Sequence, residues 1–167
     1  AKYAEMVFEE FHADVSDWAT FNEPSSTCSL GYSIGAFAPG HRSTTDHLVC
    51  GKNLLVAHAR AVETFRRGSY PGQIGIVLDY KWTYPDDPSN ADDMQLAQWD
   101  RDNMVGFWAD PIFGSGDFPE SLKTFFGDKM PVLSAQDQAA LKGSADFWGA
   151  NTYGGKITNR SAFSMTL

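Results

Sequence analysis

A chain of 167 residues is long enough for one domain, and chains of this size bury roughly 70% of their surface on folding. Its 43% hydrophobic and 14% aromatic content excludes a disordered or fibrous protein. Acidic residues outnumber basic ones by 21 to 13, and the net charge of −8 repels phosphate backbones, so we expect no nucleic-acid partner. No apolar run approaches the ~18 residues that a bilayer span needs, so we expect no membrane partner either.

The first predicted element is a helix that begins at residue 1, with Tyr3, Val7, Phe8 and Phe11 at helical spacing. No capping residue precedes it, so we expect the chain to begin inside an element. The opening residues also lack the basic start and apolar core of a signal peptide, which favours a cytoplasmic over a secreted location. A glycosylation sequon at residues 159–161 says little about secretion without such a peptide.

Hydrophobic periodicity and turn residues divide the rest of the chain into alternating strands and helices. Strands are expected over residues 15–21, 74–78 and 146–151. Helices are expected over residues 48–67, 92–109, 118–126 and 134–143. Loops rich in turn-forming residues are expected over residues 22–47 and 82–90. Ser134 and Asp137 resemble a capping box at the start of the last helix.

Strands separated by helices predict a parallel sheet, which leaves two architectures, a doubly wound sheet or part of a (β/α)₈ barrel. No Gly-x-Gly-x-x-Gly follows a strand, which counts against dinucleotide binding. Each strand ends in polar residues: Asn22-Glu23, Asp79-Tyr80 and Asn151-Thr152-Tyr153. Because the catalytic face of a barrel is built from strand ends, this pattern favours the barrel.

The remaining reactive side chains give no sign of a cofactor. Cys28 and Cys50 form neither a disulfide-rich pattern nor a metal-ligand cluster, and we expect two buried thiols. The four histidines show no ligand spacing with one another or with cysteine, so no metal site is predicted. We therefore expect neither a metal nor another cofactor.

The segment Thr20-Phe21-Asn22-Glu23-Pro24 combines a carboxylate, an amide and a stiff exit from a buried strand. A sugar hydrolase needs such a carboxyl group to donate a proton to the leaving-group oxygen. Taken alone, a single glutamate in a loop is more commonly a solvated or capping carboxylate.

The longer segment Trp18–Pro24 resembles the acid/base motif of family 1 glycoside hydrolases, the β-glucosidase family. Further segments resemble the same family in the same order. They are residues 31–40, 53–59, 73–76, 107–111, 116–119 and 141–153. The resemblance covers essentially the whole chain.

The resemblance implies roles for four residues. Glu23 would be the general acid/base, and Asn22 would bond the 2-hydroxyl of the sugar. Tyr153 would donate its hydroxyl to the nucleophilic carboxylate, and Asn151 would belong to the same polar floor. Two departures stand out: Ser25 replaces the usual aromatic residue after Asn-Glu-Pro, and Thr152 replaces a usual tyrosine.

The resemblance also implies that residues 1–167 are one partial (β/α)₈ domain, truncated at both ends and holding about strands four to six. The Thr-Glu-Asn-Gly segment that carries the family's nucleophile is absent, so we expect the chain alone to be inactive. The implied activity is that of a retaining β-glycosidase acting by double displacement. Its partner would be a small β-glucoside of the cellobiose or aryl type.

Three alternatives remain open. One is a non-catalytic sugar-binding relative of the same fold. Another is a different specificity within the family, such as a β-galactosidase or a 6-phospho-β-glycosidase. The last is an unrelated α/β module, which the linear order of the matching segments disfavours.

Overall fold

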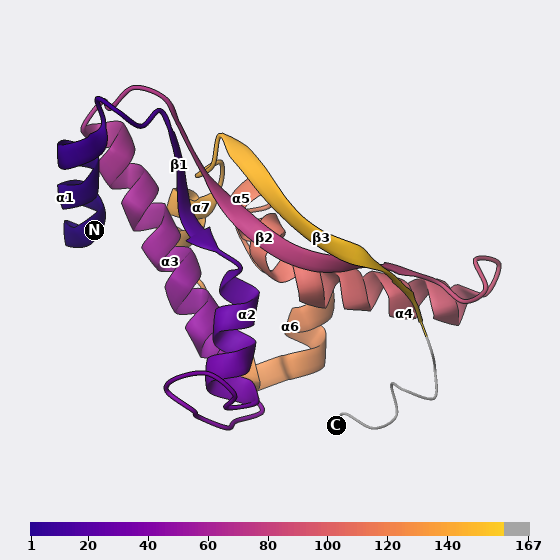
Figure 1. The fold of residues 1–167 in the computed structure, drawn as a ribbon. Helices are drawn as coiled ribbons and strands as arrows, with labels where there is room; N and C mark the ends of the chain where they lie inside the picture. Colours follow the sequence, from indigo (N-terminus) through magenta and orange to yellow (C-terminus); the bar gives the residue numbers. More distant parts are fainter. Residues whose placement is uncertain (159–167) are drawn as a thin grey trace.

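The computed structural model describes residues 1–158 as a parallel sheet of three strands with helices packed against it (Figure 1). The sequon at 159–161 lies outside the described residues. The strands are β1 (Asp17–Asn22), β2 (Gln73–Tyr84) and β3 (Phe147–Ile157). The α-helices are α1 (Lys2–Phe11), α2 (Pro24–Cys28), α3 (Asp46–Arg67), α4 (Ala91–Arg101), α5 (Phe107–Phe113), α6 (Glu120–Phe126) and α7 (Ala135–Leu141). Shorter turns are the π-helical η1 (Ser29–Ser33) and η2 (Asp102–Gly106) and the 3₁₀ turn η3 (Gly127–Lys129).

The sheet has the order β1-β2-β3, and both neighbouring pairs are parallel, as the alternation of strands and helices predicted. The register places Trp18 opposite Ile74, and Asp79 opposite Asn151. β2 and β3 are longer than predicted. Residues 82–84, expected in a loop, instead pair with residues 155–157, because Trp82, Thr83 and Tyr84 are aromatic or β-branched and suit a strand.

The helices cover one face of the sheet (Figure 1). Alternate residues of β2, Ile76 and Leu78, are buried in the main core, where α3, α5, α6 and α7 also contribute side chains. Val77, which lies between them, is only half-buried because it points to the opposite face. A doubly wound sheet carries helices on both faces, so the arrangement over residues 1–158 matches the barrel alternative.

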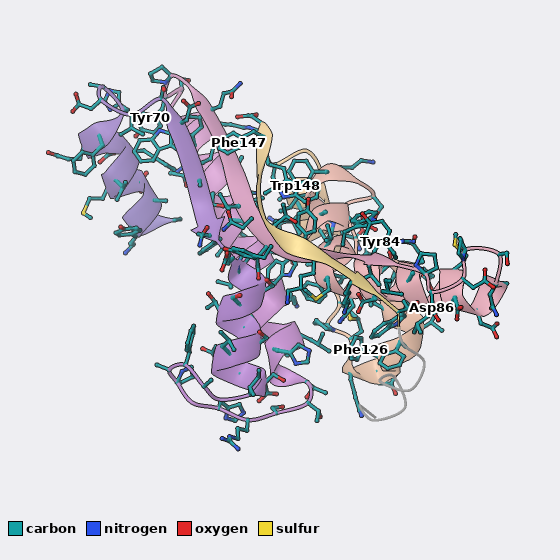
Figure 2. All side chains as sticks on the ribbon, turned by 45° about the vertical axis from the view of Figure 1, so that its right-hand side comes forward. Tyr70, Tyr84, Asp86, Phe126, Phe147 and Trp148 are labelled. Atoms are coloured by element: carbon teal, nitrogen blue, oxygen red, sulfur yellow. A yellow bond between two sulfur atoms is a disulfide. The ribbon has the colours of Figure 1, made fainter. Side chains whose placement is uncertain are left out.

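A second, smaller core joins α1 to the rest of the domain. Phe8 packs edge-on against Trp18 and Phe65, and Tyr70 lies beside it at the end of the sheet where α1 sits (Figure 2). The predicted apolar face of this helix was only partly right. Tyr3 is 75% exposed and Phe11 is 48% exposed, which leaves Phe8 as the buried anchor of α1.

Two of the predicted segments are subdivided in the structure. The loop at residues 22–47 contains α2 and η1, and the helix at 92–109 is divided into α4, η2 and α5. A π-helical turn holds one more residue than an α-helical turn, so η2 rotates the face that the following helix presents. Phe107 and Trp108 directly after it are both buried. At α7, Ser134 accepts a hydrogen bond from the N–H of Asp137, so the predicted cap is confirmed.

The prediction of two buried thiols was wrong, because Cys28 and Cys50 form a disulfide. The two residues are 22 positions apart, and their Cα atoms lie 5.6 Å apart, within the range a disulfide spans. The pairing was not predicted because the helix that contains Cys28 was itself expected to be a loop. The bond ties the end of α2 to the first turns of α3.

None of the helices found in residues 1–158 combines the length and the apolar character that crossing a membrane requires.

Candidate active site

The backbone of Glu23 marks the point where β1 ends and α2 begins. Its φ of 49° and ψ of 56° are left-handed, a backbone conformation that residues other than glycine adopt at a cost of about 1–2 kcal/mol. Its N–H donates to the carbonyl oxygen of Val77 at 2.9 Å, which anchors it to β2. Pro24 follows as the first helical residue, with a ring that fixes φ near the helical value. The backbone therefore turns sharply at Glu23, and the side chain of Glu23 points away from the strand.

The carboxylate of Glu23 meets two side chains from β3. Asn151 Nδ2 and the Tyr153 hydroxyl both donate to Glu23 Oε1, each at 2.8 Å. Asn151 Nδ2 also donates to Asn22 Oδ1 at 3.1 Å. The structure thus brings all four predicted site residues together, although about 130 positions of sequence separate the two pairs.

Two details of this cluster bear on its chemistry. Within residues 1–158, Glu23 Oε2 accepts no hydrogen bond, so this oxygen is available to a bound molecule. Tyr153, expected to donate to a nucleophilic carboxylate, donates to Glu23 in this chain. That hydrogen bond, followed by the negative charge of Glu23, raises the pKa of Tyr153 above its ordinary value.

Asp79 belongs to the same site, although its place at a strand end had predicted no specific role for it. It lies opposite Asn151 in the register of β2 and β3. Its Oδ1 accepts the hydroxyl of Ser25, and its Oδ2 accepts the hydroxyl of Ser26 at 2.9 Å. The polar end of β2 was the feature of the sequence that could have indicated Asp79. Its contacts with Ser25 and Ser26 were not predicted, because these two residues were expected to lie in a loop and not in a helix.

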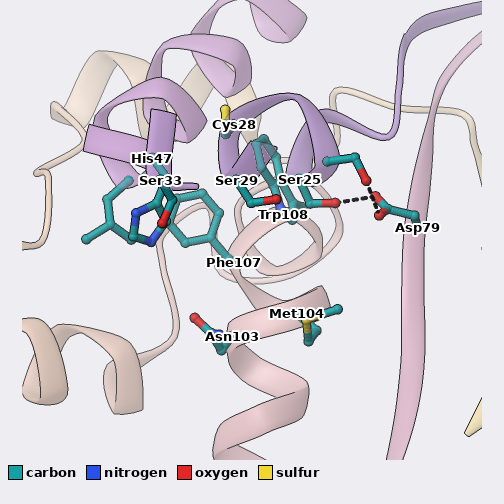
Figure 3. A pocket seen from close by; sticks show the side chains of 12 residues that line it. Ser25, Cys28, Ser29, Ser33, His47, Asp79, Asn103, Met104, Phe107 and Trp108 are labelled. Atoms are coloured by element: carbon teal, nitrogen blue, oxygen red, sulfur yellow. Dashed lines mark hydrogen bonds between the residues drawn. The ribbon is translucent and has the colours of Figure 1, made fainter. Parts of the chain in front are cut away.

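A cavity of about 250 Å³ opens beside Ser25 and Asp79, between α2, η2 and α5 (Figure 3). Phe107 and Trp108 form an aromatic wall, and hydroxyl, amide and imidazole groups form the rest of the lining. The lining residues are Ser25, Ser26, Cys28, Ser29, Ser33, His47, Leu48, Asp79, Asn103, Met104, Phe107 and Trp108. This mixture of aromatic and polar groups is typical of a site for a small organic molecule.

His58 supports β1 from behind the site. The imidazole is fully buried, with Nδ1 2.7 Å from Thr20 Oγ1 and Nε2 3.0 Å from Ser144 Oγ. Burial lowers its pKa from 6.5 to about 4, because the charged form is poorly solvated there. The neutral ring therefore links α3 to β1, two residues before Asn22, and to the segment that leads into β3.

These groups can hold a sugar hydroxyl and move a proton, which are the two tasks of a glycosidase site. Asn22 and Asn151 offer amide groups, and Glu23 offers a carboxyl oxygen. In the part of the chain that the structure describes, no group of three His, Cys, Asp or Glu side chains could hold a metal ion.

Comparisons with known proteins agree with this chemistry. The profile of glycosyl hydrolase family 1 matches residues 1–166, and the chain belongs to this family. β-Glucosidase 1B of Phanerodontia chrysosporium is 38% identical over 165 residues, which cover 91% of this chain and 30% of that protein.

Solved structures extend the similarity to the fold. The β-glucosidase of Trichoderma harzianum is 40% identical, with a TM-score of 0.87, over 93% of this chain and 33% of that one. A rice β-glucosidase is 32% identical, with a TM-score of 0.88, over 93% of this chain and 35% of the rice chain. These structures are (β/α)₈ barrels, and the α/β arrangement of this chain matches part of one. The chain spans about a third of the length of these relatives.

Proposed function

We propose that this chain carries the acid/base part of a retaining β-glucosidase active site and corresponds to about strands four to six of a (β/α)₈ barrel. The longer enzyme that would contain it is called the parent enzyme below. The observation that carries the proposal is the geometry at Glu23. Asn151 and Tyr153 hold Oε1, and Oε2 is left for a substrate.

In the first step, Glu23 gives its proton to the glycosidic oxygen. The bond from that oxygen to the anomeric carbon breaks as a second carboxylate attacks the carbon from the opposite side. The leaving alcohol departs, and a covalent glycosyl-enzyme remains. In the second step, Glu23 takes a proton from water, whose oxygen attacks the anomeric carbon and releases both the sugar and the second carboxylate. Asn22 would bond the 2-hydroxyl of the sugar throughout.

The second carboxylate would come from outside this chain, because the acids near the sheet are otherwise engaged. Both oxygens of Asp79 accept serine hydroxyls. Asp146 precedes β3, so it lies at the opposite end of that strand from Tyr153, where it binds Arg66 and the N–H of Ile74. Neither carboxylate is free to attack an anomeric carbon placed beside Glu23.

The proposed substrates are β-D-glucosides of the cellobiose or aryl type, with glucosyl residues removed from the non-reducing end. The support is that the relatives above are β-glucosidases. A non-catalytic sugar-binding relative would have no need of a carboxylate held by two donors with its second oxygen free. A galactoside or 6-phospho-glycoside remains an alternative substrate, since the groups described here do not contact the 4- or 6-position.

The test is Glu23→Ala in the parent enzyme. Hydrolysis of cellobiose should fall by roughly 10²–10⁴-fold, the usual contribution of general acid catalysis. Dinitrophenyl glucoside should keep rapid glycosylation because its leaving group needs no proton. Added azide should restore turnover and give the β-glucosyl azide. Glu10→Ala, which removes an exposed carboxylate of α1, is the matched control and should change nothing. Equal slowing of both substrates, with no azide effect, would refute the role of Glu23.

A further inference from the structure

The backbone of Glu23 needs support that its own helix does not supply. Its left-handed conformation is strained for a glutamate, and such strain persists only where the surroundings fix it. α2 has five residues, far fewer than the ~12–15 at which an isolated helix becomes even marginally stable. Contacts from outside α2 therefore hold the turn that aims the carboxylate.

Asp79 makes those contacts at the start of α2. Each of its carboxylate oxygens accepts one hydroxyl, from Ser25 and from Ser26, the second and third residues of the helix (Figure 3). Hydrogen bonds to an ionised acceptor are roughly twice as strong as those between neutral groups. The carboxylate is half-buried and stands on β2, the central strand, which is paired on both sides. Asp79 thus ties a short, strained turn to the most constrained strand of the sheet.

The same pair of register partners fixes both parts of Glu23. Asp79 and Asn151 lie opposite each other on β2 and β3. Asp79 holds the first turn of α2 and so the backbone that follows Glu23, whereas Asn151 donates directly to the Glu23 carboxylate. The backbone and the side chain of Glu23 are therefore both held by one pair of opposite residues in the sheet. A shift of either contact would move Glu23 Oε2.

We propose that Asp79 is a positioning residue for Glu23, acting through the hydroxyls of Ser25 and Ser26. The inference rests on the proposed function, because it assumes that Glu23 is the acid/base. Asp79 itself neither donates the proton nor attacks the sugar. Its removal therefore affects both proton transfers of Glu23, to the leaving group and from water, and leaves the attack of the second carboxylate largely intact.

The experiment compares Asp79→Ala and Asp79→Asn in the parent enzyme on two glucosides, one with a poor and one with a dinitrophenyl leaving group. The measured quantity is kcat/KM, which reports the first step and so protonation of the leaving group. A displacement of about 1 Å in a catalytic group costs up to 10²-fold, so Asp79→Ala should lower kcat/KM on the poor leaving group by about 10–100-fold. On the dinitrophenyl glucoside the change should stay below about threefold. Asp79→Asn should recover part of the loss, because its amide still pairs with both hydroxyls.

Two further variants keep the proposal falsifiable. In a Glu23→Ala background, Asp79→Ala should add no further loss on either substrate. Asp137→Ala removes another carboxylate that accepts a serine hydroxyl, that of Ser134 in the α7 cap, and should not alter the ratio between the two substrates. If Asp79→Ala slows both substrates equally, or adds fully to Glu23→Ala, the positioning role is wrong. If Glu23→Ala itself shows no dependence on the leaving group, the proposed function is wrong instead.

Discussion

The phenolic oxygen of Tyr153 lies 2.8 Å from Glu23 Oε1. Tyr153 is on β3 and Glu23 directly follows β1, the strand at the opposite edge of the described sheet. The hydrogen bond is made to a carboxylate, so ionising the phenol would place two negative charges side by side. This contact is the largest cause of the raised pKa of Tyr153.

Replacing Glu23 by Gln should therefore lower the pKa of Tyr153 toward the ordinary value of 10.0. The measurement is the pH titration of phenolate absorbance in the parent enzyme, with Tyr153→Phe subtracted to isolate this one tyrosine. Glu10→Gln, an exposed change far from β3, should leave the curve in place. A Tyr153 titration that is the same with Glu and Gln at position 23 would show that the contact is not made in solution.

The buried His58 predicts a loss of stability in acid. Its pKa of about 4 in the folded state lies below the unfolded value of 6.5, so the unfolded chain binds a proton first as the pH falls. The stability it contributes is complete above pH 6.5 and declines as the pH falls toward 4. With about 1.4 kcal/mol for each pKa unit, the total loss is about 3 kcal/mol.

The check is urea unfolding of the parent enzyme and of His58→Gln between pH 7.5 and 4. The variant should be less stable at pH 7.5, but its free energy of unfolding should fall less steeply with acid. Identical slopes for the two proteins would mean that His58 takes up its proton in the folded state without penalty.

The disulfide between Cys28 and Cys50 should stabilise the fold by restricting the unfolded chain. Closing a loop of 22 positions contributes about 3 kcal/mol by the chain-entropy estimate. The double variant Cys28→Ser/Cys50→Ser should lose about that much free energy of unfolding. Dithiothreitol should destabilise the parent enzyme similarly and leave the double variant unchanged. Insensitivity of the parent enzyme to reduction would contradict this account.

The 167 residues alone should hydrolyse no nitrophenyl β-glucoside. Retention of configuration needs a second carboxyl group ~5–5.5 Å from the acid/base, and the described acids near Glu23 do not offer one. The assay compares the purified chain with the parent enzyme at equal molar concentration. Turnover by the chain alone, abolished by Asp79→Ala, would make Asp79 the nucleophile and overturn the assignment given above.

The sequence predicted what depends on local pattern. Alternating strands and helices predicted the parallel pairing, and polar residues at strand ends favoured a barrel. The resemblance to family 1 then singled out Asn22, Glu23, Asn151 and Tyr153, which the structure brings together. Their roles in catalysis remain predictions. The ends of β2 were underestimated because Lys81 and the turn residues after Tyr84 obscured a strand whose partner is distant in sequence.

What the sequence did not reveal depends on contacts between distant segments. The disulfide requires α2 to lie against α3, and nothing in the spacing of Cys28 and Cys50 shows that. The contact of Ser25 with Asp79 joins positions 54 apart and required knowing that a helix starts at Pro24. The left-handed backbone of Glu23 is likewise set by its surroundings, since glutamate has no preference for that conformation.

The distance along the chain between Glu23 and Asn151 has a consequence for biosynthesis. The two residues are 128 positions apart, and at roughly 5–20 residues per second a ribosome needs about 6–26 s to pass from one to the other. During that interval Glu23 lacks its β3 partners Asn151 and Tyr153, and the edge of β2 that later pairs with β3 is unpaired. The parallel pair of β2 and β3, in which Asp79 lies opposite Asn151, 72 positions later, also forms slowly once both strands are present. The nascent chain is thus exposed to aggregation through the free edge of β2 until β3 pairs with it.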